Sequence, residues 1–298
     1  MSYDSAFGQM MNSIFGSFDM SVFSVFGSIQ NDLFTFLAKL FTCFGEPFFI
    51  VPVFLMSCVM ILFKRTRKIG FLIVLAIIFY YLLNNLVLKE AFQRLRPYNA
   101  LQSNSQYFNW YMNVGGLHES EFCFPSGHTT SVFTITTVLF LWLRFDKKKS
   151  ESCLLFVIPV LVGCSRIYLM VHYPTDVVAG AFEGLILGFA IWFLVKAIIY
   201  VKNNVKILSN INRNFDFENY IKKKFNRNLN TSSAITCMVL LVFCFLIVAF
   251  MSGNIDGDKP KCQYEGNDYV CLNEGEIKIL DNENGEIFNY CPLHANHE

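Results

Sequence analysis

Long apolar runs dominate this chain and restrict its fold more than any other feature. Five of them are long enough, or nearly so, to cross about 30 Å of hydrocarbon as a helix. They cover about residues 47–63, 69–88, 126–143, 153–172 and 176–200. A sixth run, at about 234–251, contains no charged residue. Since 54% of the 298 residues are hydrophobic and only 16% are charged, we predict an all-α, polytopic membrane helix bundle of about six spans.

The segment that precedes these runs is less apolar. Asp19, Asp32 and Lys39 interrupt residues 18–44, which favours an amphipathic helix lying in the membrane interface over another span. The expected organisation then has five parts. They are an N-terminal segment with the interfacial helix (1–45), a helical core (46–200), a basic cytoplasmic connector (201–233), an extra transmembrane helix (234–251) and an extracytoplasmic tail that contains cysteines (252–298).

Basic segments indicate how the bundle is oriented. Lysine and arginine are concentrated in the segments 64–68, 144–149 and 201–227, which fall on one side of the membrane if the spans alternate. Positive charge marks the cytoplasmic side of a membrane protein. The loop 89–125, the turn 172–176 and the tail are therefore expected outside the cytoplasm.

Three polar stretches lie at the ends of the apolar runs, all on the predicted outer side. They are Lys89…Arg96-Pro97, Pro125-Ser126-Gly127-His128 and Ser165-Arg166…His172…Asp176. Lys89 and Arg96 are two helical turns apart, so we expect them on one helix face. There they are either a clamp on an anion or a pair of cations that reach the interface.

The second and third stretches supply an anion site and reactive groups. Residues 125–128 begin a predicted span, and the free amides and dipole at a helix N-terminus attract anions. His128 is placed there as a proton donor. Arg166 is costly in an apolar run unless it meets a partner. A carboxylate at Asp176 can fix the tautomer of His172 and leave its other nitrogen as a nucleophile, although a capping acid beside an interfacial histidine is the plainer interpretation.

Taken together, the stretches resemble a known family. The pattern Lys-x6-Arg-Pro, Pro-Ser-Gly-His and Ser-Arg-x5-His-x3-Asp is similar to the signature of the type 2 phosphatidic acid phosphatase superfamily, and every specified position matches. That superfamily includes membrane lipid phosphatases, glucose-6-phosphatase and vanadium haloperoxidases. The resemblance covers about residues 18–200, and Glu46-Pro47 before the first span also looks like the bacterial members.

The resemblance implies a metal-independent phosphatase without a cofactor. His172 would attack phosphorus and form a phosphohistidine, with Asp176 orienting it. His128 would protonate the departing oxygen and then activate the water that cleaves the intermediate. The phosphoryl oxygens would be held by Lys89, Arg96, Arg166 and the amides of Ser126 and Gly127. Positioning and charge stabilisation are the main demands of phosphoryl transfer, and three cations can take the place of a divalent metal.

The motifs contact only the phosphate, so the lipid is inferred from general plausibility. We expect a phospholipid or polyprenyl phosphate substrate in a bacterial plasma membrane, with undecaprenyl diphosphate first and phosphatidic acid or phosphatidylglycerol phosphate as alternatives. A haloperoxidase-like protein and a non-catalytic lipid-binding membrane protein are the rival classes. Nucleic acid is not an expected partner, and the oligomeric state is left open.

The tail has its own cysteine pattern. A hairpin turn at Gly266-Asn267 would place Cys262 opposite Cys271, where the short Cα separation permits a disulfide. An alternative is a zinc site formed by Cys262, Cys271, Cys291 and His294. An unstructured tail is the third interpretation, and none of the three involves catalysis.

Overall fold

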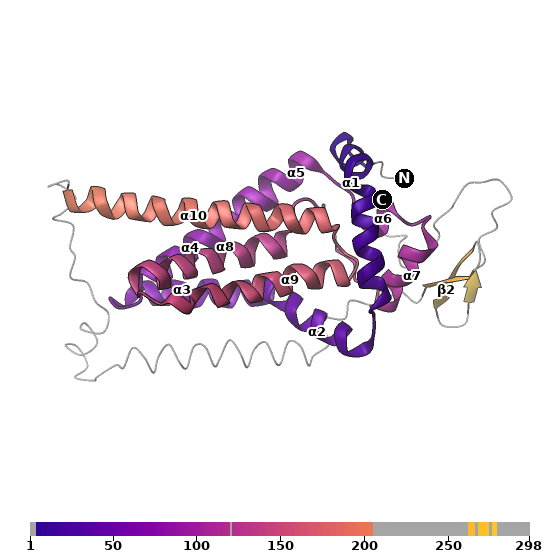
Figure 1. Ribbon diagram of the computed structural model, residues 1–298, viewed down its shortest axis with the longest axis horizontal. Helices are drawn as coiled ribbons and strands as arrows, with labels where there is room; N and C mark the ends of the chain where they lie inside the picture. Colours follow the sequence, from indigo (N-terminus) through magenta and orange to yellow (C-terminus); the bar gives the residue numbers. More distant parts are fainter. Residues whose placement is uncertain (1–3, 120, 205–261, 266–267, 274–275, 279–298) are drawn as a thin grey trace.

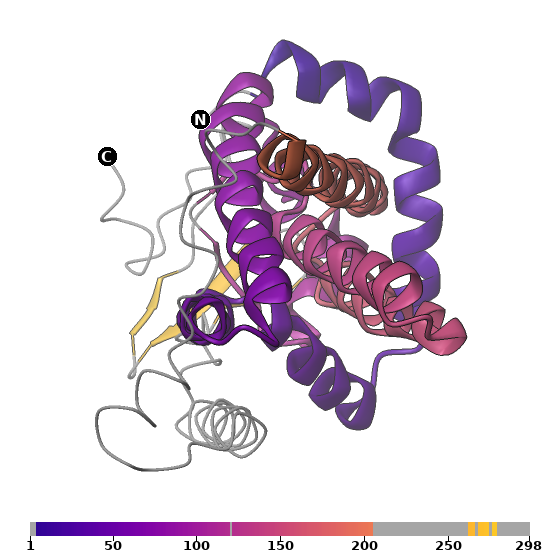
Figure 2. The ribbon, with the colours of Figure 1, turned by 90° about the vertical axis from the view of Figure 1, so that its left-hand side faces the viewer.

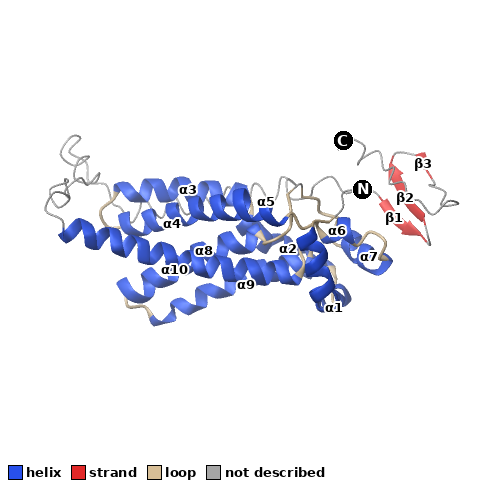
Figure 3. Ribbon diagram, turned by 90° about the horizontal axis from the view of Figure 1, so that it is seen from above, coloured by secondary structure: helices blue, strands red, loops and turns tan. Residues whose placement is uncertain are grey.

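The computed structural model describes residues 4–119 and 121–204, and three strands between residues 262 and 278. The described residues between 4 and 204 form helices joined by loops, and five of the helices run side by side along the long axis of the molecule (Figures 1 and 3). These helices are α3 (Pro47–Leu62), α4 (Arg67–Tyr80), α8 (Gly127–Leu141), α9 (Val157–Tyr168) and α10 (Pro174–Asn204). The predicted all-α bundle is confirmed for this part of the chain.

Two helices precede the bundle. Ser5 caps α1 (Ala6–Ser28) and Asn31 caps α2 (Asp32–Thr42), each by accepting a hydrogen bond from a backbone amide in the first turn. α1 lies across one end of the bundle (Figure 2). The single helix predicted over 18–44 is therefore split at residues 29–31, because the cap at Asn31 starts a new helix. Its placement in the membrane interface stays a prediction.

Short helical segments extend or connect the long helices. The π-helical segment η2 continues α4 directly into α5, and another, η3, continues α8. Two 3-10 segments, η1 and η4, come before α3 and α9. Their bounds, with those of the short helices, are η1 (Cys43–Gly45), η2 (Tyr81–Leu88), α5 (Lys89–Phe92), α6 (Pro97–Ala100), α7 (Ser105–Asn113), η3 (Trp142–Asp146) and η4 (Ser150–Phe156).

Fewer helices than predicted are apolar enough to cross a membrane. Among the described residues three stretches meet that condition: Arg67–Ala100, Ser150–Tyr168 and Pro174–Val201. Asp32–Gly45 and Pro47–Leu62, bent by 41° at their junction, make a fourth if they count as one broken span. The predicted span at 126–143 forms α8 but is not among them, and the predicted span at 234–251 lies outside the described residues.

The composition of α8 follows from its place in the bundle. It packs against α4, α9 and α10, so protein rather than lipid surrounds most of it. Thr129, Thr130, Thr134 and Thr137 on this helix are all buried. The hydroxyls of Thr134 and Thr137 donate to carbonyl oxygens one turn earlier, at 2.7 and 2.8 Å. The hydroxyl-bearing side chains are therefore satisfied inside the protein, although they lower the hydropathy of the helix.

Glycines on α10 allow it to approach α8 closely. A Cβ added at Gly184 would lie 2.5 Å from Phe133 Cβ, and one at Gly188 would lie 2.4 Å from Thr137 Cβ. These distances are shorter than any real contact, so only glycine fits at this crossing. Large apolar side chains such as Phe182 and Ile186 are exposed on α10, where lipid can cover them.

The two ends of the bundle differ in chemistry. At one end Lys68 forms an ion pair with Asp146, and Lys196 Nζ lies 3.7 Å from the other oxygen of that carboxylate. The predicted basic loops 64–68 and 144–149 thus lie together at this end. The three polar stretches lie at the opposite end, as predicted. Which end faces the cytoplasm stays a prediction.

Three short strands form an antiparallel sheet in the tail. They are β1 (Cys262–Glu265), β2 (Asp268–Asn273) and β3 (Glu276–Lys278), in the order β1-β2-β3. The backbone register pairs Cys262 with Cys271. The predicted disulfide depends on side chains outside the described part of the chain. The alternative zinc site also requires Cys291 and His294, which lie outside it too.

Candidate active site

The three polar stretches come together where four helices begin or end. α5 and α9 end there, α8 and α10 begin there, and the loop that contains residues 114–119 and 121–126 leads from α7 to α8. All the residues singled out from the motifs lie in this region. They are Lys89, Arg96, Ser126, Gly127, His128, Arg166, His172 and Asp176.

Lys89 and Arg96 do not share a helix face, and that prediction is wrong. Helix α5 ends at Phe92, because Gln93 adopts a left-handed conformation with φ of 46°. Arg96 is in extended backbone directly before Pro97. The two side chains nevertheless meet the same loop residue. Lys89 pairs with the carboxylate of Glu121, and Arg96 Nε donates to the Glu121 carbonyl oxygen at 2.8 Å.

His172 is buried, with Arg96 at one ring nitrogen and Asp176 near the other. Its Nε2 lies 2.8 Å from Arg96 Nη1, and its Nδ1 lies 3.6 Å from Asp176 Oδ2. Asp176 turns back toward the histidine because its Oδ2 also accepts the backbone N–H of Tyr173 at 3.0 Å. Arginine can only donate, so Nε2 of His172 is the acceptor and a neutral ring carries its proton on Nδ1, facing Asp176.

The surroundings of His172 keep its ring neutral. Burial lowers the pKa of His172 well below its usual range, and the positive charges of Arg96, Arg166 and Lys89 act in the same direction. In this tautomer Nε2 is unprotonated, and its electron pair accepts the hydrogen bond from Arg96; an unprotonated nitrogen is what a nucleophilic imidazole needs. Burial and these cations therefore favour the neutral form of His172 at neutral pH.

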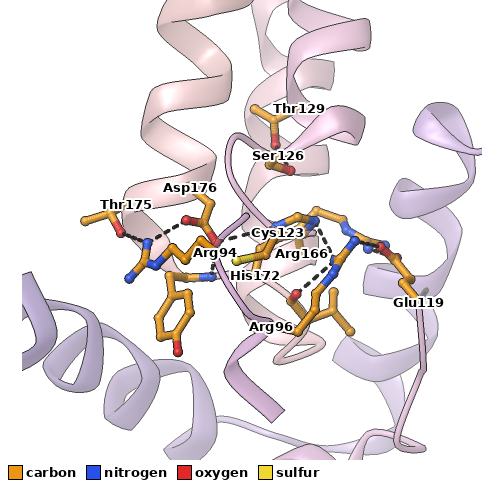
Figure 4. A network of polar contacts seen from close by, with 12 residues as sticks. Arg94, Arg96, Glu119, Cys123, Ser126, Thr129, Arg166, His172, Thr175 and Asp176 are labelled. Atoms are coloured by element: carbon orange, nitrogen blue, oxygen red, sulfur yellow. Dashed lines mark hydrogen bonds and ion pairs between the residues drawn. The ribbon is translucent and has the colours of Figure 1, made fainter. Parts of the chain in front are cut away.

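An acidic side chain occupies the centre of the cationic group. Glu119 Oε2 lies 2.6 Å from Arg96 Nη2, and its other oxygen pairs with Arg166 Nη2 (Figure 4). Arg166 Nη1 also donates to Thr42 Oγ1 at 2.7 Å, so it is fixed from the end of α2. A carboxylate that bridges two guanidinium groups shows that this position accepts an anion with two or more oxygens.

His128 also lies near Glu119. Its Nε2 is 2.9 Å from Glu46 Oε1. Gly45, between α2 and α3, lets the His128 ring come close, because a Cβ at this position would lie 2.5 Å from the ring. Ligand atoms of Glu46, Glu119 and His128 lie within 4.8 Å of one another. This set could hold a metal ion, but each member already has an ion-pair partner in the site.

The start of α8 completes the site. Gly127 is the first residue of the helix, and a Cβ there would lie 3.4 Å from Lys89 Nζ and 3.3 Å from Asn84 Oδ1. The N-terminal amides of α8 thus lie beside a cation, which suits an anion. The Ser126 amide donates to the carbonyl oxygen of Asp176 at 3.1 Å. Its hydroxyl oxygen accepts from Thr129 Oγ1 at 3.0 Å, so the hydroxyl proton is what Ser126 has left to donate.

Sequence reasoning missed the residues that hold the motif side chains in place. Arg94 lies inside the first motif, in a position that the pattern leaves unspecified, and its guanidinium bonds to Asp176. Glu119 lies in a loop to which no role was assigned. Asp19 was noted only as an interruption of an apolar segment. A charged residue in an otherwise apolar or patterned segment was the one available signal for Arg94 and Asp19.

Comparison with known proteins agrees with this geometry. The family model of the PAP2 superfamily matches residues 67–201. An undecaprenyl-diphosphatase of Sulfolobus acidocaldarius is 32% identical over 162 residues, which are 53% of this chain and 68% of that protein. Phosphatidylglycerophosphatase B of Bacillus subtilis is 34% identical over 156 residues, 50% of this chain and 70% of that protein.

A solved structure shows the same fold. The chain is similar to the crystal structure of a transmembrane PAP2-type phosphatidylglycerolphosphate phosphatase from Bacillus subtilis, with a TM-score of 0.52 and 28% identity. The likeness covers 64% of this chain and 92% of that one. The chain is accordingly an integral membrane protein with transmembrane helices. With its motif residues gathered in one site, it belongs to the PAP2 superfamily of membrane lipid phosphate phosphatases.

Proposed function

We propose that this PAP2 phosphatase, a hydrolase acting on phosphoric esters, cleaves a lipid phosphate through a phosphohistidine and without a metal. One observation carries the proposal. The Glu119 carboxylate joins Arg96 to Arg166, Arg96 contacts His172 Nε2, and a carboxylate oxygen of Glu119 lies within 4.8 Å of a His128 ring nitrogen. An anion at this position is therefore close to both of the histidines that the reaction requires.

The first half of the reaction transfers the phosphoryl group to the protein. The substrate phosphate replaces Glu119 between the two arginines, and Arg96 leaves Nε2 to bind a phosphoryl oxygen. His172 Nε2 then attacks phosphorus, a P–N bond forms, and the P–O bond to the lipid breaks. His128 gives its proton to the departing oxygen. The Nδ1–H of His172 faces Asp176, so the positive charge that develops on the ring is stabilised by a carboxylate.

The second half returns the protein to its starting state. A water molecule gives a proton to His128 and attacks phosphorus, the P–N bond breaks, and inorganic phosphate leaves. Lys89, Arg96 and Arg166 hold the phosphoryl oxygens throughout, together with the Ser126 hydroxyl and the Gly127 amide. Glu46 orients the His128 ring through its contact with Nε2. Three fixed cations supply the charge stabilisation that a divalent metal provides in other phosphoryl transfers.

For the substrate we propose undecaprenyl diphosphate, presented to a site on the extracytoplasmic face of a bacterial plasma membrane. The similarity to the undecaprenyl-diphosphatase of Sulfolobus acidocaldarius supports this lipid. Phosphatidylglycerol phosphate and phosphatidic acid are the alternative, supported by the similarity to phosphatidylglycerophosphatase B. The site lies at one end of the bundle, where a lipid headgroup meets water.

The experiment is phosphate release by the purified full chain in detergent, with EDTA present. The panel contains undecaprenyl diphosphate, phosphatidylglycerol phosphate and phosphatidic acid at equal mole fraction. We expect turnover of at least one lipid, with the highest kcat/KM for undecaprenyl diphosphate. A higher kcat/KM for phosphatidylglycerol phosphate would favour the alternative. No release from any of them, by a monodisperse protein, would contradict the proposed activity.

A further inference from the structure

A buried arginine connects the N-terminal helix to Asp176, the carboxylate proposed to orient His172. Arg94 Nη1 donates to Asp176 Oδ1 at 2.6 Å, and Arg94 Nη2 lies 3.2 Å from Asp19 Oδ2 (Figure 4 shows Arg94 beside Asp176). Asp19 is in α1, which precedes the first span. The three side chains form a continuous chain of alternating charge that ends at the carboxylate next to His172.

The surroundings hold this arginine in a single orientation. Thr175 Oγ1 accepts from Arg94 Nη1 at 2.9 Å, and Asn12 Oδ1 accepts from Nη2 at 2.7 Å. The Arg94 guanidinium carbon lies 3.8 Å from the centre of the Tyr173 ring. Asp19 is fixed in turn, since its Oδ1 accepts the Thr175 amide at 3.0 Å. A planar group that donates from both terminal nitrogens and stacks on an aromatic ring must be arginine, because lysine has neither property.

The three charged side chains are buried, so the loss of one would strongly affect the others. The exposed fractions of Asp19, Arg94 and Asp176 are 1%, 0% and 0%. In this environment an unpaired charge is very unfavourable, so loss of Arg94 would leave two carboxylates without a counter-ion. At least one of them would then take up a proton or turn away. Because Asp176 is one of the two, the consequence reaches His172.

We infer that Arg94 and Asp19 are positioning residues for catalysis: Arg94 holds Asp176 in the orientation that faces His172 Nδ1, and Asp19 holds Arg94. This inference rests on the proposed roles of His172 and Asp176. It also gives α1 a part in the reaction, although the motifs lie wholly outside that helix. Together the two acids and Arg94 carry one net negative charge, which suits the imidazolium formed when His172 is phosphorylated.

The test measures kcat, KM and the inhibition constant of orthovanadate for the full chain in detergent. The variants are Arg94→Met, Arg94→Lys, Asp19→Asn and the double variant of Arg94→Met with Asp19→Asn. Arg144→Met and Asp32→Asn serve as matched controls, since both residues are exposed and lie away from the site. His172→Ala is the inactive reference.

We expect Arg94→Met to lower kcat by about 10- to 100-fold, the range that loss of an orienting partner typically costs. KM and vanadate inhibition should stay within about threefold of wild type, because the phosphate-binding cations are unchanged. Asp19→Asn should lower kcat less, and the double variant should be no worse than Arg94→Met, because two residues acting on one contact are not additive. A purely structural role would lower the melting temperature and leave kcat per folded molecule unchanged.

With an active wild type, two outcomes overturn the inference. One is a kcat for Arg94→Met within threefold of the Arg144→Met control in an active wild-type background. The other is a proportional loss of vanadate binding, which would mean collapse of the whole site. If Arg94→Met does not fold, Arg94→Lys and Asp19→Asn decide by the same criteria. An inactive wild type would instead refute the proposed function, and the inference with it.

Discussion

The carboxylate of Glu119 binds Arg96 through one oxygen, at 2.6 Å from Nη2, and binds Arg166 through the other. A loop residue thus stands where the proposed mechanism needs the substrate phosphate. The side chain of Glu119 is 23% exposed, so it can leave toward solvent when a lipid phosphate arrives. In the proposed mechanism, substrate binding is then an exchange of one anion for another.

Glu119→Gln should tighten substrate binding. The neutral amide competes less well for the two guanidinium groups, so we expect KM to fall about fivefold, equivalent to roughly 1 kcal/mol. The value of kcat should change little, because Glu119 has left the site before the reaction. Initial rates on the preferred lipid check this, with Glu90→Gln, an exposed residue of α5, as the control. A raised KM would mean instead that Glu119 supports the site.

The sequence was most informative where the chemistry is local. The spacing from His172 to Asp176 predicted that the carboxylate would turn back to the imidazole, and it does so within one helical turn. The basic loops predicted which ends of the helices lie together. In both cases the residues that decide the geometry are close in the chain or follow from the alternation of spans.

The remainder depended on tertiary structure. Gln93 ends α5 in a left-handed conformation, and no neighbouring glycine in the sequence indicated a helix end there. Lys89 and Arg96 were therefore wrongly predicted on one helix face. Glu119 reaches the arginines because of how a long loop folds over the helix ends. Asp19 and Arg94 are 75 residues apart in the chain, and their pairing follows only once α1 lies across the bundle. Patterns in single segments contain no information about such contacts.

Variants of the two histidines should separate the two halves of the reaction. His172→Ala should lower kcat by at least about 10³-fold, on the order of what loss of a nucleophile costs. His128→Asn should lower kcat by about 10²- to 10⁴-fold, the contribution of a general acid and base. With a substrate that has a good leaving group, His128→Asn should also accumulate acid-labile protein phosphate, and His172→Ala should not. Labelling with ³²P-phosphate lipid and an acid-lability test measure this. Protein phosphate in His172→Ala would contradict the assigned nucleophile.

The lowered pKa of His172 predicts activity in mild acid. The ring must be neutral to attack, so the acid limb of phosphoenzyme formation should lie below about pH 6.5, the ordinary value for imidazole. Burial is the main cause of the shift, and nearby cations add to it. Arg166→Gln removes one of these cations and should move the limb toward higher pH. The charged groups that face His172 are Arg96, Arg166, Lys89, His128 and Asp176.

Single-turnover rates between pH 4.5 and 8, in roughly half-unit steps, measure the acid limb of phosphoenzyme formation. Such rates separate transfer of the phosphoryl group to His172 from the later hydrolysis of the phosphohistidine. Arg166→Gln will also bind substrate more weakly, so the position of the limb is compared and not its height. A limb above pH 7 in the wild type would contradict the neutral, buried histidine of this structure.

Removal of metal ions should leave turnover unchanged. Glu46, Glu119 and His128 could hold an ion by distance, but in the proposed mechanism Lys89, Arg96 and Arg166 supply the positive charge. We expect less than about a twofold change in kcat after dialysis against EDTA. Phosphate release with and without added Mg²⁺ checks this. A loss of activity in EDTA that Mg²⁺ restores in the wild type, but not in Glu46→Gln, would assign these three residues to a metal site.

The contact between α8 and α10 should tolerate no side chain at Gly184. A Cβ there would lie 2.8 Å from the Thr130 carbonyl oxygen as well as against Phe133, and neither group can move without shifting the α8 backbone. Overpacking of this kind costs about 1–3 kcal/mol, so Gly184→Ala should lower the melting temperature in detergent. Since α8 begins at the proposed phosphate site and α10 carries Asp176, kcat should fall with the melting temperature. Gly16→Ala is the matched control, because a Cβ at Gly16 meets nothing within 4 Å and alanine favours a helix by about 1 kcal/mol over glycine. Equal melting temperatures for the two variants would mean that α10 can move away from α8 at little cost.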